Sequence, residues 1–336
     1  MAETLDKKDL LYVISQSVYD CGWNLFYISD RHPFKLRIFN NNESYCIKII
    51  IYNITHGGGY KRAANEYRIQ MKIPNLSPEE NYTTLILGYY SELKVFAGWD
   101  MQKHLGDIGF SSSFQIKEEN LYNAANFGFS ACKKDNEEIA IAFRPDMFIE
   151  YIKNLEVLHA FGKSNKDFSI LDEITRNEII KNDELISQIS SKPRQTVLKI
   201  ISKKQRDNTF RSKVLRAYNY KCAFTGIQLK LVDAAHIVPV HYEESTDDTC
   251  NGIALSALCH RAYDRGLITF NRQYKIIINS NEIEMLKKDD LFGGLDNFKN
   301  NLRKIIDLPS AINDRPNVKF IELANSLRGW DKKEDL

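Results

Sequence analysis

Three short stretches between residues 230 and 270 hold the side chains of this sequence that are best suited to hydrolytic chemistry. The run LVDAAHIVPV (231–240) is apolar, stops at Pro239 and carries His236. Asn251 follows in CNG (250–252), and SALCHRAYDRG (256–266) then supplies His260 and Asp264. A neutral imidazole is the side chain best matched to take a proton near pH 7. The spacing therefore predicts a general base close to a second group of polar side chains.

The elements expected around these residues would bring them together. LVDAAHIVPV is typical of a strand, in which Asp233 and Ala235 share one face and His236 takes the other. Ser256 can cap a short helix that ends at a glycine. Residues four apart lie on one face of a helix, so His260 and Asp264 can point at a single ion.

Each of these residues also has an ordinary structural interpretation. His236 can be a core histidine that is hydrogen-bonded to backbone, and Asn251 with Gly252 can be a turn dipeptide. His260 and Asp264 can form a surface pair at the i,i+4 spacing. The occurrence of all of them in one short segment favours a site.

A basic block comes directly before this segment. Between Lys192 and Lys221 the chain has ten lysines and arginines against one acid, Asp207, whereas the whole chain has a net charge of only +2. Such a block is typical of a surface that binds a polyanion, although a solvated helix face has the same composition. The candidate DNA contacts in it are Lys199, Lys203, Lys204, Arg206, Arg211 and Lys213.

The composition is that of a globular protein with room for two domains. Of the 336 residues, 43% are hydrophobic and 27% are charged, and no apolar run is long enough to cross a bilayer. The mixed charges of MAETLDKKDLLYV do not resemble a signal peptide, and the six cysteines form no C-x-x-C pair. We therefore expect a cytoplasmic protein with free thiols and no membrane association.

Strand-like runs dominate the first 150 residues and helical patterns follow. The runs at 24–28, 35–39, 45–52, 83–90, 93–99 and 138–145 are short and rich in β-branched or aromatic residues, and helices are expected near 7–20, 61–71 and 146–158. The fold class we expect is α+β, with a mixed or antiparallel sheet domain followed by a smaller C-terminal domain. The expected division is a first domain at 1–155, a helical linker with basic residues at 156–204, and a second domain with a helical tail at 205–336.

The segment FRSKVLRAYNYKCAFTG…DAAHIVPV…NGIALSALCHRAYDRGLITF resembles the HNH (ββα-metal) endonuclease module, in the variant found at the C-terminus of many restriction endonucleases. The resemblance covers about residues 205–275. It implies two strands and a helix around one metal, with His236 as the general base and Asn251 holding the loop that orients it. It also implies that Asp264 binds Mg²⁺ or Mn²⁺ and that His260 binds the metal or contacts phosphate.

Two departures from the family pattern affect the metal site. Many HNH proteins carry a histidine or aspartate immediately before the base, whereas this chain has Ala235, so Asp233 is the candidate substitute ligand. Some relatives hold a structural zinc on two C-x-x-C pairs. Because Cys222 is followed by Thr225 at the matching position, we expect no structural zinc here.

The N-terminal region has a looser resemblance to the domain that precedes the nuclease module in some bacterial restriction-type proteins. THGGGYKRAANEYRIQMK (55–72) and AFRPD (142–146) carry arginines and aromatic residues that suit contacts to bases, among them Arg62 and Arg144. Glu66 and Arg68 in the first stretch can equally pair with each other.

Together these features predict a metal-dependent endonuclease that cuts double-stranded DNA, most simply a type II restriction enzyme with a cognate methyltransferase. Cutting both strands with a one-metal module predicts a homodimer. A nuclease that cuts modified DNA or acts in phage defence is the alternative with the same chemistry. A DNA-binding protein with a degenerate nuclease module is the alternative from another class.

Overall fold

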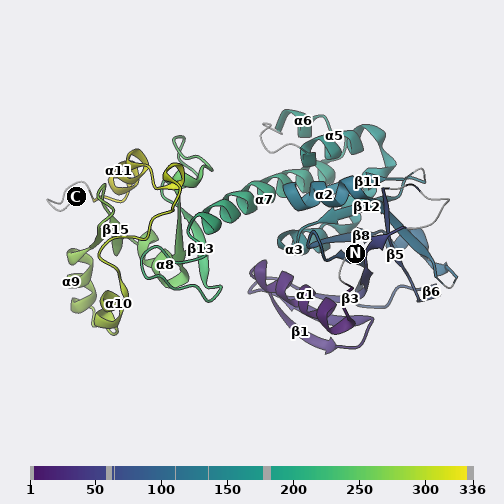
Figure 1. Cartoon of the computed structure of the whole chain (residues 1–336), viewed down its shortest axis with the longest axis horizontal. Coiled ribbons are helices and arrows are strands. Elements are labelled where there is room, and N and C mark those ends of the chain that lie inside the picture. Colours follow the sequence, from purple (N-terminus) through teal and green to yellow (C-terminus); the bar gives the residue numbers. More distant parts are fainter. Residues whose placement is uncertain are drawn as a thin grey trace. The chain divides into compact units, whose positions relative to one another are not determined.

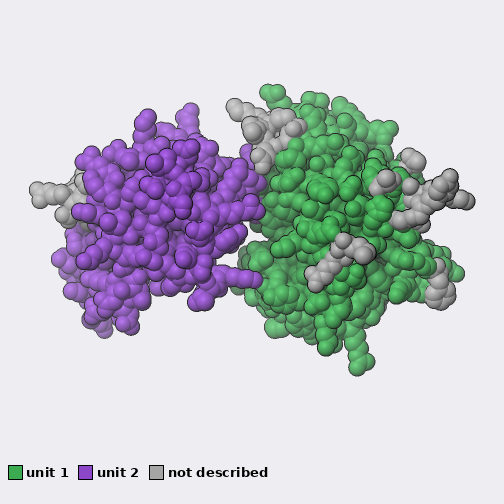
Figure 2. Space-filling view, viewed as in Figure 1, with its two compact units in different colours: residues 1–205 green, residues 206–336 purple. Residues whose placement is uncertain are grey.

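The computed structural model describes residues 4–57, 63, 65–109, 111–134, 136–176 and 183–330. The chain divides into two compact units, residues 1–205 and residues 206–336 (Figure 2). Each unit has its own buried apolar cluster and is described separately below. The α+β class expected from the sequence is confirmed.

A seven-stranded sheet forms the centre of the first unit (Figure 1). In spatial order its strands are β1 (Asn24–Ser29), β2 (Phe34–Phe39), β3 (Ser44–Asn53), β7 (Thr83–Tyr90), β8 (Val95–Trp99), β12 (Ile139–Phe143) and β11 (Phe129–Lys133). β3 and β7 are parallel, and all other neighbours in the sheet are antiparallel. The central strands β8 and β12 are buried along their whole length, because both faces of the sheet are covered.

Helices cover one face of this sheet and smaller elements cover the other. Helix α1 (Lys7–Asp20) starts with a capping box in which Asp6 accepts from the Asp9 amide at 2.9 Å, and it buries Leu10, Ile14 and Val18 on the first face. The second face packs against α2 (Glu118–Phe127) and a three-stranded sheet of β10 (Ser113–Lys117), β5 (Glu66–Gln70) and β4 (Thr55–His56).

The predicted helix near 61–71 is wrong where the structure describes it. Residues 66–70 form β5, which pairs with β10 from Glu66 opposite Lys117 to Gln70 opposite Ser113. Ile69 and its cross-strand partner Phe114 are both buried under the large sheet. This long-range pairing decides the conformation, since the local pattern is compatible with a helix or a strand.

Residues 156–204, which we expected to connect the domains, pack on the first unit. They contain α4 (Leu155–His159), α5 (Asn165–Arg176), α6 (Asp183–Ser187) and the start of α7 (Lys192–Ala217). Leu171, Ile174 and Leu198 are buried in the core of that unit. The buried Asp167 also accepts from Arg194 at 2.6 Å. Amphipathic helices with this much apolar surface need a core to pack on, and the nearest core is the first sheet.

The second unit is built on the end of α7 and two small sheets. β13 (Val232–His236) pairs with β14 (Gly252–Ser256), and β15 (Ile268–Phe270) pairs with β16 (Ile276–Ile278), both antiparallel. The helices after β14 are α8 (Ala257–Asp264), α9 (Ser280–Lys288), α10 (Leu295–Asn301) and α11 (Val318–Leu327). Its core gathers Phe210, Val214, Phe224, Ile253 and Tyr263.

No helix among the described residues is long and apolar enough to cross a membrane.

Candidate active site

The hairpin of β13 and β14 with helix α8 brings the predicted site residues into one small module. His236 is the last residue of β13 and lies opposite Gly252, the first residue of β14. Gly252 is required there, because a Cβ atom would lie 2.2 Å from Cγ2 of Val214. β14 leads directly into α8, whose N-cap is Ser256. The end of β13 with His236 and helix α8 with His260 and Asp264 therefore belong to one strand–strand–helix module, as the sequence predicted.

His236 is held from two sides. Its ring stacks on Phe210 with centroids 3.7 Å apart and an interplanar angle of 11°. Its Nε2 lies 3.0 Å from Oδ1 of Asp247, a residue of the loop between β13 and β14. The side chain is 16% exposed, so it reaches solvent while most of it is packed. These contacts differ from those of a core histidine that is bonded to backbone.

Asn251 is fully buried and holds the loop between the two strands. Its Oδ1 accepts from the Val238 amide at 2.9 Å, and its Nδ2 donates to the Thr246 carbonyl at 2.9 Å and to the Ser245 hydroxyl at 3.2 Å. Both ends of the loop are thus tied to one side chain. An Asn251–Gly252 pair that served only as a turn dipeptide would not need these side-chain hydrogen bonds.

His260 and Asp264 lie together on one face of α8. His260 Nε2 is 3.4 Å from Oδ2 of Asp264, and both side chains have solvent access. Asp233 is placed differently, since its carboxylate accepts from Arg211 at 2.9 Å. Asp233 is exposed although Ala235, on the same face by strand alternation, is buried. Within the described ranges no three His, Cys, Asp or Glu side chains are grouped so that they can hold a metal.

The donor set nevertheless suits a hard cation. One imidazole and one carboxylate on adjacent turns are too few for a closed structural site. Mg²⁺ and Mn²⁺ are commonly bound by one or two protein groups together with water and phosphate oxygens. His260 and Asp264 therefore fit the metal that the module implies, with open positions left for substrate.

The predicted DNA contacts fall into three groups. All six basic candidates of the block lie on α7, and five of them are exposed while Lys204 is half-buried. Arg144 is engaged by Asp146 through two bonds of 3.2 and 3.1 Å, at the start of a short turn of helix. Arg62 lies outside the described residues.

Two buried thiols lie in the core of the second unit, one of them on α8 itself. Cys222 and Cys259 are both inaccessible to solvent in the core of the second unit. A hydrogen bond from the Cys259 thiol lowers the pKa of Cys222 to about 4, and the same bond raises the pKa of Cys259. Both are free thiols, as the sequence predicted, and their burial in the apolar cluster is that of packing residues.

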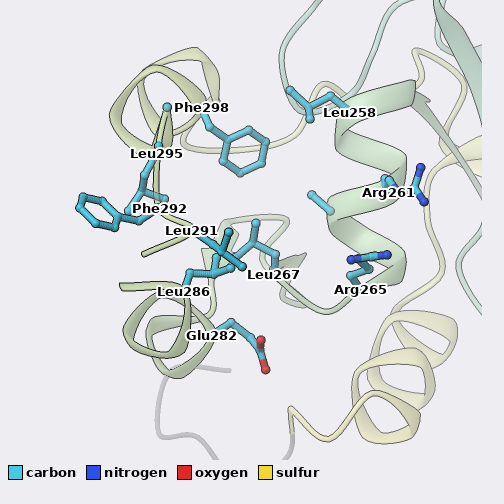
Figure 3. Close-up of a pocket in the computed structure, with 13 residues that line it drawn as sticks. Leu258, Arg261, Arg265, Leu267, Glu282, Leu286, Leu291, Phe292, Leu295 and Phe298 are labelled. Carbon is cyan, nitrogen blue, oxygen red and sulfur yellow. The ribbon is translucent and has the colours of Figure 1, made fainter. Parts of the chain in front are cut away.

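A cavity of the second unit lies elsewhere on α8. It has a volume of about 780 Å³, and α8 contributes Leu258, Arg261, Ala262 and Arg265 to its wall. Figure 3 shows Leu258 and Phe298 on opposite sides of this apolar hollow. His260 and Asp264 do not line it, so it is not part of the candidate site. A phosphodiester on a DNA surface needs no enclosed pocket of this kind.

Sequence reasoning missed Asp247 and Phe210. The only signal for Asp247 is the acidic loop HYEESTDDTCNG (241–252), in which four acids are equivalent by sequence. Phe210 carries no signal beyond an aromatic residue on a basic helix. Their contacts with His236 depend on how the loop and α7 pack, which local patterns do not specify.

Two family models match the chain. Residues 222–271 match a model described as HNH endonuclease, and residues 46–152 match one described as Methylase-associated X1. No curated protein matches. Among solved structures, the chain is similar to one described as "Modification dependent TagI restriction endonuclease", with a TM-score of 0.30 and 9% identity over 87% of this chain and 84% of that chain.

The HNH match covers the part of the second unit that holds the candidate site. It includes both strands of the hairpin, the loop with Asp247, and α8 with its histidine–aspartate pair. The observed order of strand, loop, strand and helix agrees with the resemblance found in the sequence. Residues 222–271 are therefore an HNH endonuclease domain, and the chain is a DNA endonuclease.

Proposed function

We propose that the chain is a divalent-metal-dependent restriction endonuclease of type II that cuts double-stranded DNA. The observation that carries this proposal is the geometry of His236. Its imidazole lies at the end of β13 with Nε2 bonded to a carboxylate, in the same module as the His260–Asp264 pair. Such an imidazole suits a general base. Its Nε2 is fixed by the hydrogen bond to the carboxylate, and its Nδ1 remains to accept a proton from a water molecule.

The proposed reaction is hydrolysis of one phosphodiester bond. A water molecule gives a proton to Nδ1 of His236 while its oxygen bonds to phosphorus. The bond from phosphorus to the leaving sugar oxygen breaks, and that oxygen takes a proton from solvent. His236 then returns its proton to solvent and is ready for the next cycle. Atoms and charge balance without any redox partner.

His260 and Asp264 are the residues we propose to hold the metal. A divalent cation, Mg²⁺ or Mn²⁺, would supply positive charge against the negative charge that develops on the phosphate. Asp233 is a weaker candidate for this role, because its carboxylate is engaged by Arg211. Asn251 acts on the loop and not on the substrate, since its side chain is fully buried.

The basic residues on α7 are the proposed phosphate contacts of the DNA duplex. Lys199, Lys203, Arg206 and Lys213 are exposed and form no ion pair with any described residue. Contacts of this kind position the duplex without reading its sequence. Target reading is then assigned to the first unit, whose residues 46–152 match the Methylase-associated X1 model.

The Methylase-associated X1 match favours a function within restriction and modification. It supports a cognate methyltransferase as partner, and equally a nuclease that cuts only modified DNA. Digestion of one plasmid, unmodified or methylated in parallel, separates these two functions. Cleavage of the unmodified form alone supports the type II function, and cleavage of the methylated form alone supports the modification-dependent one.

Cutting both strands of a duplex requires two active sites, and we propose a homodimer for that reason. Sedimentation of the protein with and without duplex DNA tests the proposed homodimer.

The whole proposal is tested by the His236→Ala variant on plasmid DNA. Loss of nicking and linearisation with DNA binding retained supports it. A variant that binds DNA and also cuts it at the wild-type rate refutes the role of His236. A wild-type protein that binds DNA without cutting it under Mg²⁺ or Mn²⁺ favours a degenerate module.

A further inference from the structure

We infer that Asp247 is a positioning residue that holds His236 in the tautomer and orientation needed for proton transfer. The inference rests on the proposed function, because it concerns the same imidazole. Nε2 of His236 lies 3.0 Å from Oδ1 of Asp247, within normal hydrogen-bond distance. No other hydrogen bond of this imidazole occurs within the described residues.

The chemistry of the pair fixes where the proton lies. An ionised carboxylate has no hydrogen to donate, so Nε2 must carry the proton of the bond. In a neutral ring the lone pair is then on Nδ1. The Asp247 carboxylate thus selects the tautomer in which Nδ1 is the basic nitrogen.

The ring cannot easily leave this arrangement. Phe210 stacks on its face at 3.7 Å, which restricts tilting, and the hydrogen bond to Asp247 restricts rotation in the ring plane. Phe210 itself is buried in the core of the second unit. A catalytic group fixed by packing and by a second hydrogen bond loses little orientation before the reaction.

Asp247 is held in turn by the loop that Asn251 organises. Asn251 donates to the carbonyl of Thr246, the residue directly before Asp247, and also contacts Ser245 and Val238. The buried amide therefore sets the backbone from which the Asp247 side chain reaches His236. Asn251 thus orients the base indirectly, through Asp247.

The charge of Asp247 has a second effect during the reaction. When Nδ1 takes the proton of water, the ring becomes a cation that donates to an anionic partner at Nε2. An ion pair of this kind favours the imidazolium, and the proton on Nε2 stays where it is. Asp247 is 54% exposed, and an ion pair with so exposed a partner contributes little to the stability of the fold. Its effect should appear in turnover and not in folding.

The experiment compares Asp247→Ala and Asp247→Asn with Asp248→Ala and Asp248→Asn in the full-length protein. Asp248 is an exposed neighbour whose side chain makes no cap hydrogen bond, so its variants change the charge of the same loop. Cleavage of supercoiled plasmid DNA with Mg²⁺ gives kcat and KM. The ¹⁵N resonances of the His236 ring, assigned by their loss in His236→Ala, report the tautomer.

We expect Asp247→Ala to lower kcat roughly 100-fold, the scale of a misplaced catalytic group, with KM for DNA unchanged. The Nε2–H tautomer should dominate in the wild type and be lost in Asp247→Ala, while both Asp248 variants should keep wild-type kcat and tautomer. A wild-type kcat in Asp247→Ala, or an equal loss in Asp248→Ala, overturns the inference. A wild type in which Nδ1 carries the proton overturns it too, whatever the activity. If His236→Ala still cuts, the proposed base itself fails, and this outcome is distinct because it does not involve Asp247.

Discussion

Replacing Asn251 by alanine should unfold the second unit at a lower denaturant concentration. The amide makes three good hydrogen bonds inside the protein, to Val238, Thr246 and Ser245. A buried bond is worth about 1 kcal/mol net, and a buried donor left unpaired costs about 1–3 kcal/mol. The two bonds to Thr246 and Ser245 contribute about 1 kcal/mol each, and the buried Val238 amide would be left without its acceptor, so we expect a loss of about 3–5 kcal/mol in the free energy of unfolding.

The tryptophans allow this loss to be assigned to one unit. Of the three in the chain, Trp330 lies in the second unit and is buried, whereas Trp23 and Trp99 are buried in the first unit. Urea unfolding followed by Trp330 fluorescence, with the other two replaced by phenylalanine, gives the free energy for the second unit. Ser245→Ala is the matched control, because it removes one partly buried hydroxyl that accepts from the Asn251 amide at 3.2 Å and donates to the Val238 carbonyl at 2.9 Å, and it should cost about 1–2 kcal/mol.

This prediction is refuted if the free energy of unfolding of Asn251→Ala lies within about 0.5 kcal/mol of the wild-type value, the range of ordinary surface substitutions. It is also refuted if the variant and Ser245→Ala are equally destabilised. In either case the buried amide would not be the residue that holds the loop.

Two further predictions concern the metal and the DNA. The double variant His260→Ala/Asp264→Ala should lose Mn²⁺ binding in calorimetry. Asp233→Asn should keep Mn²⁺ binding, because the Asp233 carboxylate is paired with the Arg211 guanidinium. Equal Mn²⁺ binding by the wild type and both variants contradicts the proposed ligand set. Lys203→Gln and Arg206→Gln should each weaken DNA binding and reduce the slope of log K against log salt by about 1, since each exposed cation would neutralise one phosphate. Unchanged slopes in fluorescence anisotropy would show that α7 does not contact the DNA backbone.

Much of the candidate site is predictable from the sequence because its order is local. Strand, loop, strand and helix follow one another within residues 232–264, so the alternation around His236 and the i,i+4 pair on α8 are set by short-range geometry. The capped helix at 7–20 and the six strand-like runs are likewise visible as periodic patterns.

The features that sequence patterns did not show all depend on long-range packing. Residues 66–70 become a strand because a partner some fifty residues away pairs with them. Asp233 pairs with Arg211, 22 residues earlier in the chain, because the fold brings these two charges together. Asp247 is one of several acids in its loop, and only the folded loop brings its carboxylate to His236.

The central claim, that His236 is the base of a DNA nuclease, is tested most directly by comparing His236→Ala with His241→Ala. His241 is an exposed histidine of the same loop region, and its ring contacts Tyr242 at 4.5 Å. In single-turnover cleavage of bound plasmid DNA with Mg²⁺, we predict that His236→Ala is slowed by about 10²- to 10⁴-fold, the usual contribution of a general base. His241→Ala should cut at the wild-type rate, and both variants should bind DNA equally well. Cleavage by His236→Ala within a few-fold of the wild-type rate would contradict the account.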